Sequence, residues 1–212
     1  MKPPLFDFGD YADQFQGDIW GLTPHFHAGC RVLDIGANRG LVTAFCAVNG
    51  AFVTAYEVHP DAYKSLLQAI KINQVEHLVQ TVNVGVWTHT GTARFDRTIQ
   101  SAVHYANSII SERSPHDYFT DPITAREQIA PTVSFKEAIG EDIWDIVKMD
   151  IEGAEYPILL ECPESVFDHI RFLTVETHPY LGTEREDLLD RLGKHFDFEK
   201  QAPIFAVNKR RL

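Results

Sequence analysis

The sequence lacks three features that would each indicate a particular class of protein. Its three cysteines show no C-x-x-C spacing, and an odd number without metal-ligand spacing predicts reduced thiols in the cytoplasm. No apolar run approaches the roughly 20 residues that a membrane span needs, so we expect no membrane-spanning segment. The N-terminal residues, MKPPLFDFGDYAD, lack the apolar core of a secretory signal peptide.

Basic residues are also scarce. The chain carries 19 lysines and arginines against 30 aspartates and glutamates, which gives a net charge of −11. Tight binding to a nucleic-acid backbone needs clustered lysine and arginine side chains that displace counterions. Only residues 209–211 form a basic run, so we expect no nucleic-acid partner.

The 212 residues are enough for one well-buried domain, and apparent strands and helices alternate along most of the chain. This alternation predicts an α/β fold with a parallel sheet built by right-handed crossovers. The expected strands are 32–35, 51–58, 78–86, 143–149 and 171–176, followed by an antiparallel hairpin of 196–201 and 204–208. The expected helices are 41–49, a helix capped by Asp61, 133–139, 155–160 and 184–195.

Two segments do not follow this alternation. Residues 1–29 are rich in aromatic side chains, and we interpret them as a hydrophobic cover or as one wall of a substrate pocket. Residues 97–131 are polar and contain Pro115 and Pro122. A segment this long between regular elements is usually functional or disordered, and its histidines and aromatic residues favour a lid or substrate loop. The main domain is therefore predicted to span residues 30–212.

A glycine turn lies between the first expected strand and the first expected helix, in the sequence RVLDIGANRG of residues 31–40. The dinucleotide fingerprint G-x-G-x-x-G would need glycines at positions 38 and 41, which hold Asn38 and Leu41. The second glycine of that fingerprint lets the backbone approach a pyrophosphate. Its absence argues against NAD and FAD.

S-adenosylmethionine (AdoMet) fits the turn better, because it carries no phosphate. Asp34 can face its amine, while Gly36 and Gly40 let the backbone lie along its methionine part. Glu57 ends the second expected strand, where a carboxylate can accept hydrogen bonds from both ribose hydroxyls. The predicted cofactor-binding residues are Asp34, Gly36, Ala37, Asn38, Gly40, Glu57, Val58, Asn83 and Val84.

Carboxylates crowd the end of the fourth expected strand, in the sequence KMDIEGAE of residues 148–155. Ligands of open α/β sheets bind at the carboxyl ends of the strands. Asp150 is therefore expected to face the same crevice as Glu57, with Glu176 and His178 beside it. A simpler interpretation exists for Glu152 and Glu155, because carboxylates near the N-terminus of a helix are stabilised by its dipole.

Four stretches of the sequence together resemble a known family: VLDIGANRG, YEVHP, IVKMDIEGAEYPILL and TVETHP. They are similar to the FkbM-type family of AdoMet-dependent methyltransferases, over roughly residues 30–180. The resemblance implies a single Rossmann-like class I methyltransferase domain, whose seven-stranded sheet is mostly parallel, has an antiparallel last strand and carries helices on both faces. It also implies O-methylation of a hydroxyl on a sugar, a glycan or a secondary metabolite.

The predicted catalytic residues are His178, Asp150, Lys148 and Glu176. His178 is the first candidate for a general base, because an unperturbed histidine titrates near neutrality. Lys148 is the second candidate, on the condition that burial lowers its pKa. In an alternative mechanism, Asp150, Glu176 and His178 bind Mg²⁺ or Mn²⁺, which acidifies the substrate hydroxyl. The version without a metal stays open at this point.

Two other functions stay open as well. The chain could methylate a protein or nucleic acid, although its acidic charge argues against nucleic acid. It could also be a nucleotide-binding module without catalysis, which would have no need of the carboxylates and His178. The expected partner is a small molecule with a hydroxyl group, and the oligomeric state is undetermined, with a homodimer as one option.

Overall fold

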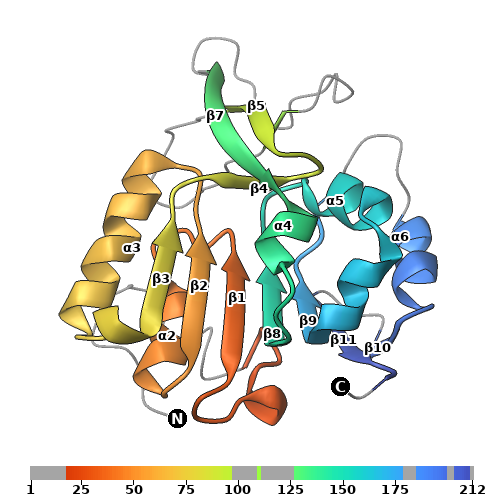
Figure 1. The fold of residues 1–212 in the computed structure, drawn as a ribbon, viewed down its shortest axis with the longest axis horizontal. Helices are drawn as coiled ribbons and strands as arrows, with labels where there is room; N and C mark the ends of the chain where they lie inside the picture. Colours follow the sequence, from red (N-terminus) through yellow and green to blue (C-terminus); the bar gives the residue numbers. More distant parts are fainter. Residues whose placement is uncertain (1–17, 97–108, 111–126, 179–184, 200–202, 211–212) are drawn as a thin grey trace.

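The computed structural model describes residues 18–96, 109–110, 127–178, 185–199 and 203–210. They form a main sheet with helices on both faces and a second, smaller sheet beyond one end of its strands (Figure 1). Within this part of the chain, no helix is both long enough and apolar enough to cross a membrane. Most of the aromatic-rich segment and most of residues 97–131 lie outside the described residues.

The main sheet has seven strands in the order β10-β11-β9-β8-β1-β2-β3. Its strands are β1 (Arg31–Ile35), β2 (Phe52–Tyr56), β3 (Val79–Val82), β8 (Trp144–Met149), β9 (Ile170–Val175), β10 (Phe196–Glu199) and β11 (Ile204–Asn208). Neighbouring strands are parallel except at β11, which runs antiparallel to both β9 and β10. The predicted mostly parallel sheet with an antiparallel last strand is therefore confirmed.

Strands β1 and β8 lie at the centre of this sheet and are almost entirely buried. Strands that are covered on both faces consist of nearly continuous apolar runs, which is why the sequence located both of them. Each strand carries one buried charged residue, and the two, Asp34 and Lys148, are direct partners in the register of the sheet. The centre of the domain therefore holds a buried pair of opposite charges.

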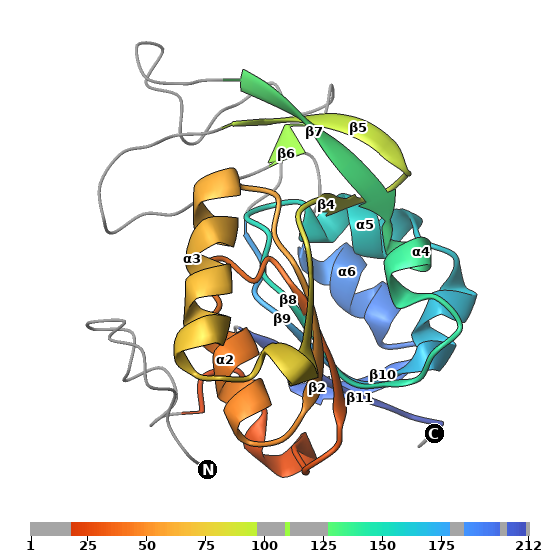
Figure 2. The ribbon, with the colours of Figure 1, turned by 60° about the vertical axis from the view of Figure 1, so that its left-hand side comes forward.

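Helices α2 (Leu41–Val48) and α3 (Pro60–Ile72) cover one face of the main sheet, and helices α4 (Phe135–Ile139), α5 (Glu155–Glu161) and α6 (Arg185–Leu192) cover the other (Figure 2). Successive residues of β1 point to opposite faces, so Val32 packs in the first layer and Leu33 in the second. Trp20 and Leu22, from the end of the aromatic-rich segment, are buried in the α2–α3 layer. Short 3₁₀ turns are η2 (Thr23–His25), η3 (Glu76–Leu78) and η4 (Glu164–His169).

Helix α3 begins differently from the prediction. The sequence predicts Asp61 as its N-cap, but the cap is His59, whose Nδ1 accepts hydrogen bonds from the backbone N–H groups of Asp61 and Ala62. Pro60 takes the first helical position, where its missing N–H leaves no hydrogen bond unmade. The prediction was wrong because aspartate is the common cap, whereas a histidine can cap only when the loop brings its ring over the helix end.

The second sheet has the strand order β4-β7-β5-β6. Its strands are β4 (Gly85–Trp87), β5 (Gly91–Asp96), β6 (Ile109–Ile110) and β7 (Glu127–Ser134). It lies beyond the carboxyl ends of β1, β2 and β3 (Figure 1). Since ligands of open α/β sheets bind at these ends, β4 and its neighbours bound the region where a ligand is expected.

The prediction of a single third strand over residues 78–86 is wrong in its second half. The chain leaves the main sheet after Val82, and β4 pairs in parallel with β7. Residues 127–131, predicted as part of a lid, belong to β7, which runs on to Ser134. The helix expected at 133–139 consequently begins at Phe135.

Candidate active site

The glycine turn of residues 36–40 joins β1 to α2, and contacts within the chain explain both glycines. Gly36 has a φ of +79°, and a Cβ there would lie 1.9 Å from the carbonyl oxygen of Asp150. Gly40 has a φ of +87°, and a Cβ there would lie 2.6 Å from Cδ1 of Leu66 on α3. Gly36 therefore lets the segments that follow β1 and β8 come into close contact, and Gly40 lets α2 pack against α3.

Replacing Gly36 with alanine is expected to destabilise the protein more than the same change at Gly29. Both glycines have positive φ, +79° and +82°, where a Cβ costs roughly 1–2 kcal/mol. At Gly29, however, no described heavy atom beyond the chain neighbours lies within 4 Å of a Cβ. The clash at Gly36 should lower the free energy of unfolding by roughly a further 1–3 kcal/mol. Urea unfolding measures both variants, and equal losses would contradict the close contact with Asp150.

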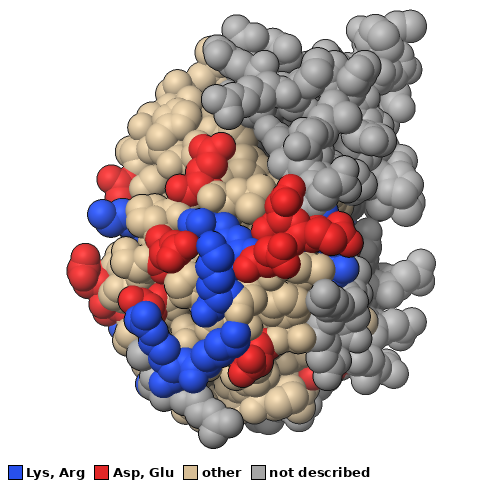
Figure 3. Space-filling view, turned by 90° about the vertical axis from the view of Figure 1, so that its right-hand side faces the viewer, with Lys and Arg blue, Asp and Glu red and all other residues tan. Residues whose placement is uncertain are grey.

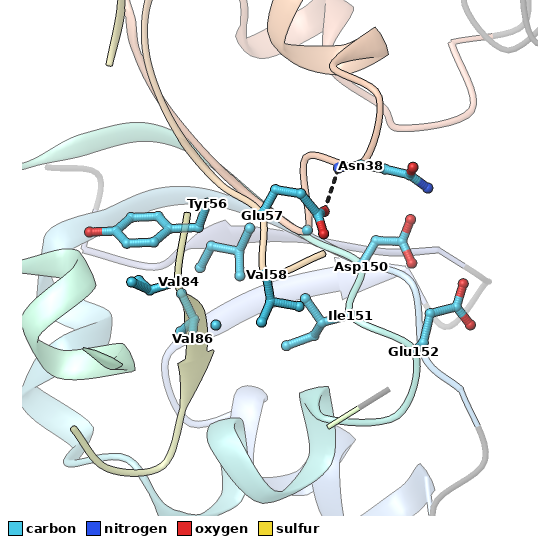
Figure 4. Close-up of a pocket in the computed structure, with 12 residues that line it drawn as sticks. Asn38, Tyr56, Glu57, Val58, Val84, Val86, Asp150, Ile151 and Glu152 are labelled. Carbon is cyan, nitrogen blue, oxygen red and sulfur yellow. Dashed lines mark hydrogen bonds between the residues drawn. The ribbon is translucent and has the colours of Figure 1, made fainter. Parts of the chain in front are cut away.

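A cleft opens where the turn, the end of β2, strand β4 and the segment after β8 meet (Figure 4). The space measures about 530 Å³ when the part that is open to solvent is included. Carboxylates of Glu57, Asp150 and Glu152 lie toward one side of it, and Val84 and Val86 lie toward the other. The residues that line it are Ile35, Gly36, Asn38, Tyr56, Glu57, Val58, Val84, Gly85, Val86, Asp150, Ile151 and Glu152.

The structure brings only part of the predicted cofactor-binding set to this cleft. Gly36, Asn38, Glu57, Val58 and Val84 line it, whereas Asp34, Ala37, Gly40 and Asn83 do not. The amide of Asn83 instead donates a hydrogen bond of 2.7 Å to the carbonyl oxygen of Glu57, which braces the end of β2. Apolar walls of the cleft are formed by Tyr56, Val86 and Ile151, which the sequence did not predict because such residues are typical of an ordinary core.

Glu57 is held in place by the backbone around it. One oxygen of its carboxylate accepts a hydrogen bond of 2.8 Å from the N–H of Asn38, and the other accepts one of 2.6 Å from the N–H of His59. Burial raises the pKa of Glu57 to about 7, although these two N–H groups and Lys148 act in the opposite direction. A fixed carboxylate with both oxygens at the edge of a cleft can accept hydrogen bonds from a vicinal diol.

Asp34 and Lys148 form a buried network behind the cleft. The Nζ of Lys148 lies 3.4 Å from Asp34, 3.6 Å from Asp150, and donates a hydrogen bond of 2.7 Å to the carbonyl oxygen of Gly36. The second oxygen of Asp34 accepts a hydrogen bond of 2.6 Å from the hydroxyl of Thr43. Asp34 is fully buried, so it supports the turn from behind rather than facing the cleft.

Carboxylates and a histidine gather where β8 and β9 end. Nε2 of His178 lies 3.3 Å from Glu152, and its Nδ1 lies 3.2 Å from Glu155. Glu155 has no exposed surface, and its two oxygens accept hydrogen bonds of 2.8 Å from the N–H groups of Ile151 and Gly153. These bonds place Glu155 at the start of α5, as its simpler interpretation predicted, and they also hold it against His178.

The sequence matches the family model described as "Methyltransferase FkbM domain" over residues 34–199. The chain belongs to the FkbM methyltransferase family. This assignment confirms the predicted family and the predicted enzyme class, an AdoMet-dependent methyltransferase. A search of curated proteins gave no match.

Solved structures share the fold at low sequence identity. Methyltransferase FkbM from Methylobacillus flagellatus KT gives a TM-score of 0.52 and 13% identity, over 84% of this chain and 43% of that chain. Magnesium protoporphyrin IX methyltransferase from Synechocystis PCC 6803, determined with bound SAM, gives 0.50 and 11%, over 94% and 82%. A putative rRNA-methylase from Clostridium thermocellum gives 0.49 and 12%, over 98% and 94%, which is too weak to bear on the acceptor. The first two likenesses show the class I methyltransferase fold alone.

Two premises about the base of this FkbM-type methyltransferase need correction. Burial by itself would lower the pKa of Lys148, but Asp34 and Asp150 together raise it, so the condition for Lys148 to act as a base is not met. Burial would likewise lower the pKa of His178, but Glu155 and Glu152 raise it to about 9. At neutral pH both side chains therefore carry their protons in this arrangement, and neither has the near-neutral pKa that the sequence suggested.

Glu152 and Glu176 also depart from their ordinary behaviour in this methyltransferase. Burial raises the pKa of Glu152 to about 7, and neighbouring Asp150 acts in the same direction. Burial also raises the pKa of Glu176, again with Asp150 as the next cause. Both shifts reflect carboxylates held close together and partly out of water. The predicted simple role of Glu152 at a helix end is thus incomplete, since it also lines the cleft.

Proposed function

We propose that this methyltransferase transfers a methyl group from AdoMet to a hydroxyl oxygen of a small molecule. The observation that supports the proposal is the shared cleft, which Glu57 lines on one strand end and Asp150 and Glu152 line on another. In this proposal the cofactor site and a set of hydrogen-bond acceptors for a hydroxyl would lie side by side. Holding two reactants in line can supply about 7–11 kcal/mol in well-oriented systems.

The residues of the cleft fit the parts of AdoMet. Glu57 would hold the ribose hydroxyls, because its carboxylate is fixed by Asn38 and His59. Val58 and Val84 line the cleft and would flank the adenine, as ligand pockets are lined mainly by apolar side chains. When bound, AdoMet supplies a methyl group that is activated by its sulfonium.

The acceptor side of the cleft is acidic. Asp150 and Glu152 offer carboxylate oxygens that can accept a hydrogen bond from the hydroxyl and orient its oxygen. Phosphorylated or otherwise anionic acceptors would be repelled by these groups. The substrate class that fits is therefore a neutral or cationic molecule with a free hydroxyl, such as a sugar or a secondary metabolite.

Charge on the surface supports a small acceptor over nucleic acid. On the face shown in Figure 3, basic and acidic side chains lie among one another rather than forming a basic area. Arg191 and Lys194 each lie 3.7 Å from Glu164, and Lys209 lies 3.9 Å from Asp197. Because an acidic side chain lies beside each of these cations, they do not form the clustered net positive charge that binds a phosphate backbone. A cytoplasmic location also belongs to the proposal, supported by three free, buried cysteines.

Methyl transfer from isotope-labelled AdoMet to a panel of acceptors tests the proposal. The panel should contain neutral sugars, phenols and polyols, together with ribosomal RNA and a protein mixture. We expect label in at least one hydroxyl compound and in neither macromolecule. Label in RNA or protein alone would replace this function with the macromolecular alternative, and binding of S-adenosylhomocysteine without any transfer would favour a non-catalytic module.

A further inference from the structure

Three side chains beside the cleft can each direct one ligand atom at a common point. They are Asp150, Glu152 and His178, whose ligand atoms all lie within 4.8 Å of one another. Asp150 follows β8 and His178 follows β9, and these strands are parallel neighbours paired at Met149 and Val175. The sheet therefore delivers the donors from two adjacent strand ends, while Asp150 and Glu152 also line the cleft.

The surroundings of His178 match those of a metal-binding histidine, and a cation at Nε2 would displace the proton that this nitrogen carries opposite Glu152. Histidine ligands usually bind the metal through one ring nitrogen and donate the N–H of the other to a carboxylate, which fixes the ring. Nδ1 of His178 lies 3.2 Å from Glu155, while Nε2 points to Glu152 at 3.3 Å. Glu155 is fully buried and held by two backbone N–H groups, so it is a rigid partner for Nδ1.

Negative charge is concentrated around these donors. The carboxylates of Asp150 and Glu155 act electrostatically on both Glu152 and Glu176, and Glu176 also acts on Glu152. Lys148 offsets part of this charge, but it is shared with buried Asp34 on the other side. Two carboxylates and one imidazole, with room for water or substrate on the side of the cleft, are donors that suit Mn²⁺ or Mg²⁺.

We propose that Asp150, Glu152 and His178 bind one divalent cation beside the cofactor cleft, with Glu155 as the positioning residue for His178. The ligand set differs from the one expected from the sequence, because Glu152 takes the place of Glu176. The inference deepens the proposed O-methylation and rests on it in one respect, the role of the cation. An acceptor hydroxyl bound to the cation would be oriented and made more acidic.

Calorimetric titration of the chelator-treated full chain with MnCl₂, in the presence of S-adenosylhomocysteine, tests the site. We expect one Mn²⁺ per chain with a Kd below about 1 mM. Glu152→Gln and His178→Ala should each weaken binding at least 10-fold, and Glu155→Gln should weaken it by about 10–100-fold through the orientation of His178. Glu176→Gln should weaken Mn²⁺ binding less than Glu152→Gln does. The control is Glu161→Gln, a change at an exposed residue of α5, which should leave the Kd for Mn²⁺ unchanged.

Wild-type chain without Mn²⁺ binding would overturn the inference, and so would binding that survives Glu152→Gln unchanged. In both cases the three donors would form only an ion-paired cluster. The wild-type titration needs no variant, and Glu152→Gln is a conservative change of a partly exposed side chain, so loss of folding would not obscure the answer. Methyl transfer that persists fully in EDTA would exclude a role of the cation in catalysis but would leave the proposed function intact. Mn²⁺ binding by a chain that methylates no hydroxyl would support the cation site and contradict the proposed O-methylation.

Discussion

Replacing Glu57 with alanine is expected to weaken the binding of S-adenosylhomocysteine at least 100-fold. The reason is that the variant loses the carboxylate that would accept a hydrogen bond from each of the two ribose hydroxyls, and each bond to such a charged group is worth about 1.5–3 kcal/mol. A factor of 100 corresponds to only about 2.7 kcal/mol, so the expected loss is a lower bound. Calorimetry or equilibrium dialysis measures it directly.

The variant also removes the partners of the N–H groups of Asn38 and His59. Leaving these donors without acceptors should lower the free energy of unfolding by about 1–3 kcal/mol. Binding must therefore be compared at a temperature where circular dichroism shows the variant folded. Glu76→Ala, a change at an exposed glutamate in η3, provides the control. A folded Glu57→Ala variant with wild-type affinity would remove Glu57 from the cofactor site.

The same site should make cofactor affinity depend on pH. The pKa of Glu57 is about 7 in the folded chain, because burial disfavours its charged form, whereas an exposed glutamate titrates near about 4.3. Between these values the folded chain holds the proton more tightly than the unfolded chain, so this group's contribution to stability falls as the pH rises through that window.

The effect of pH on cofactor affinity has the opposite sign. The diol needs the ionised form of Glu57, so cofactor affinity should rise with pH below about 7 and level off above it. An identical pH profile in Glu57→Ala would assign the effect to another group.

The contrast between β1 and β4 shows which parts of the fold the sequence could predict. β1 and β8 are covered on both faces, so their local composition alone marks them as strands. β4 carries an equally strand-like composition and follows soon after β3, but it pairs with β7 in the second sheet. A local pattern records that a segment is extended and not which sheet it joins.

The candidate site also contains features that the sequence could predict and features that it could not. Glu57 and Asp150 could be found because they follow apolar strands, and both line the cleft. The actual surroundings of Lys148 and His178 could not be predicted, since a pKa depends on every charge that packs nearby in three dimensions. Gly36 was predicted for the right position on incomplete grounds, because the carbonyl of Asp150 already excludes a Cβ there without any ligand.

Replacing Lys148 with methionine should have the largest effect on stability. Methionine keeps much of the side-chain volume but removes the cation that lies 3.4 Å from Asp34 and 3.6 Å from Asp150. Asp34 has no exposed surface, so its charge would be left buried and uncompensated. Breaking a buried pair in this way typically costs about 3–5 kcal/mol. Urea unfolding should show this loss, whereas Lys64→Met, which breaks an exposed pair with Asp61, should cost less than about 1 kcal/mol.

The double variant Asp34→Asn/Lys148→Met separates a structural role of Lys148 from a catalytic one. Asparagine can keep an oxygen as acceptor for the hydroxyl of Thr43 and carries no charge, so the double variant should recover most of the lost stability. Replacing both members of a buried pair is often close to neutral. If the double variant also regains methyl transfer, Lys148 acts through the fold of the turn and not as a base. If Lys148→Met instead keeps wild-type stability but loses methyl transfer, Lys148 takes part in catalysis directly.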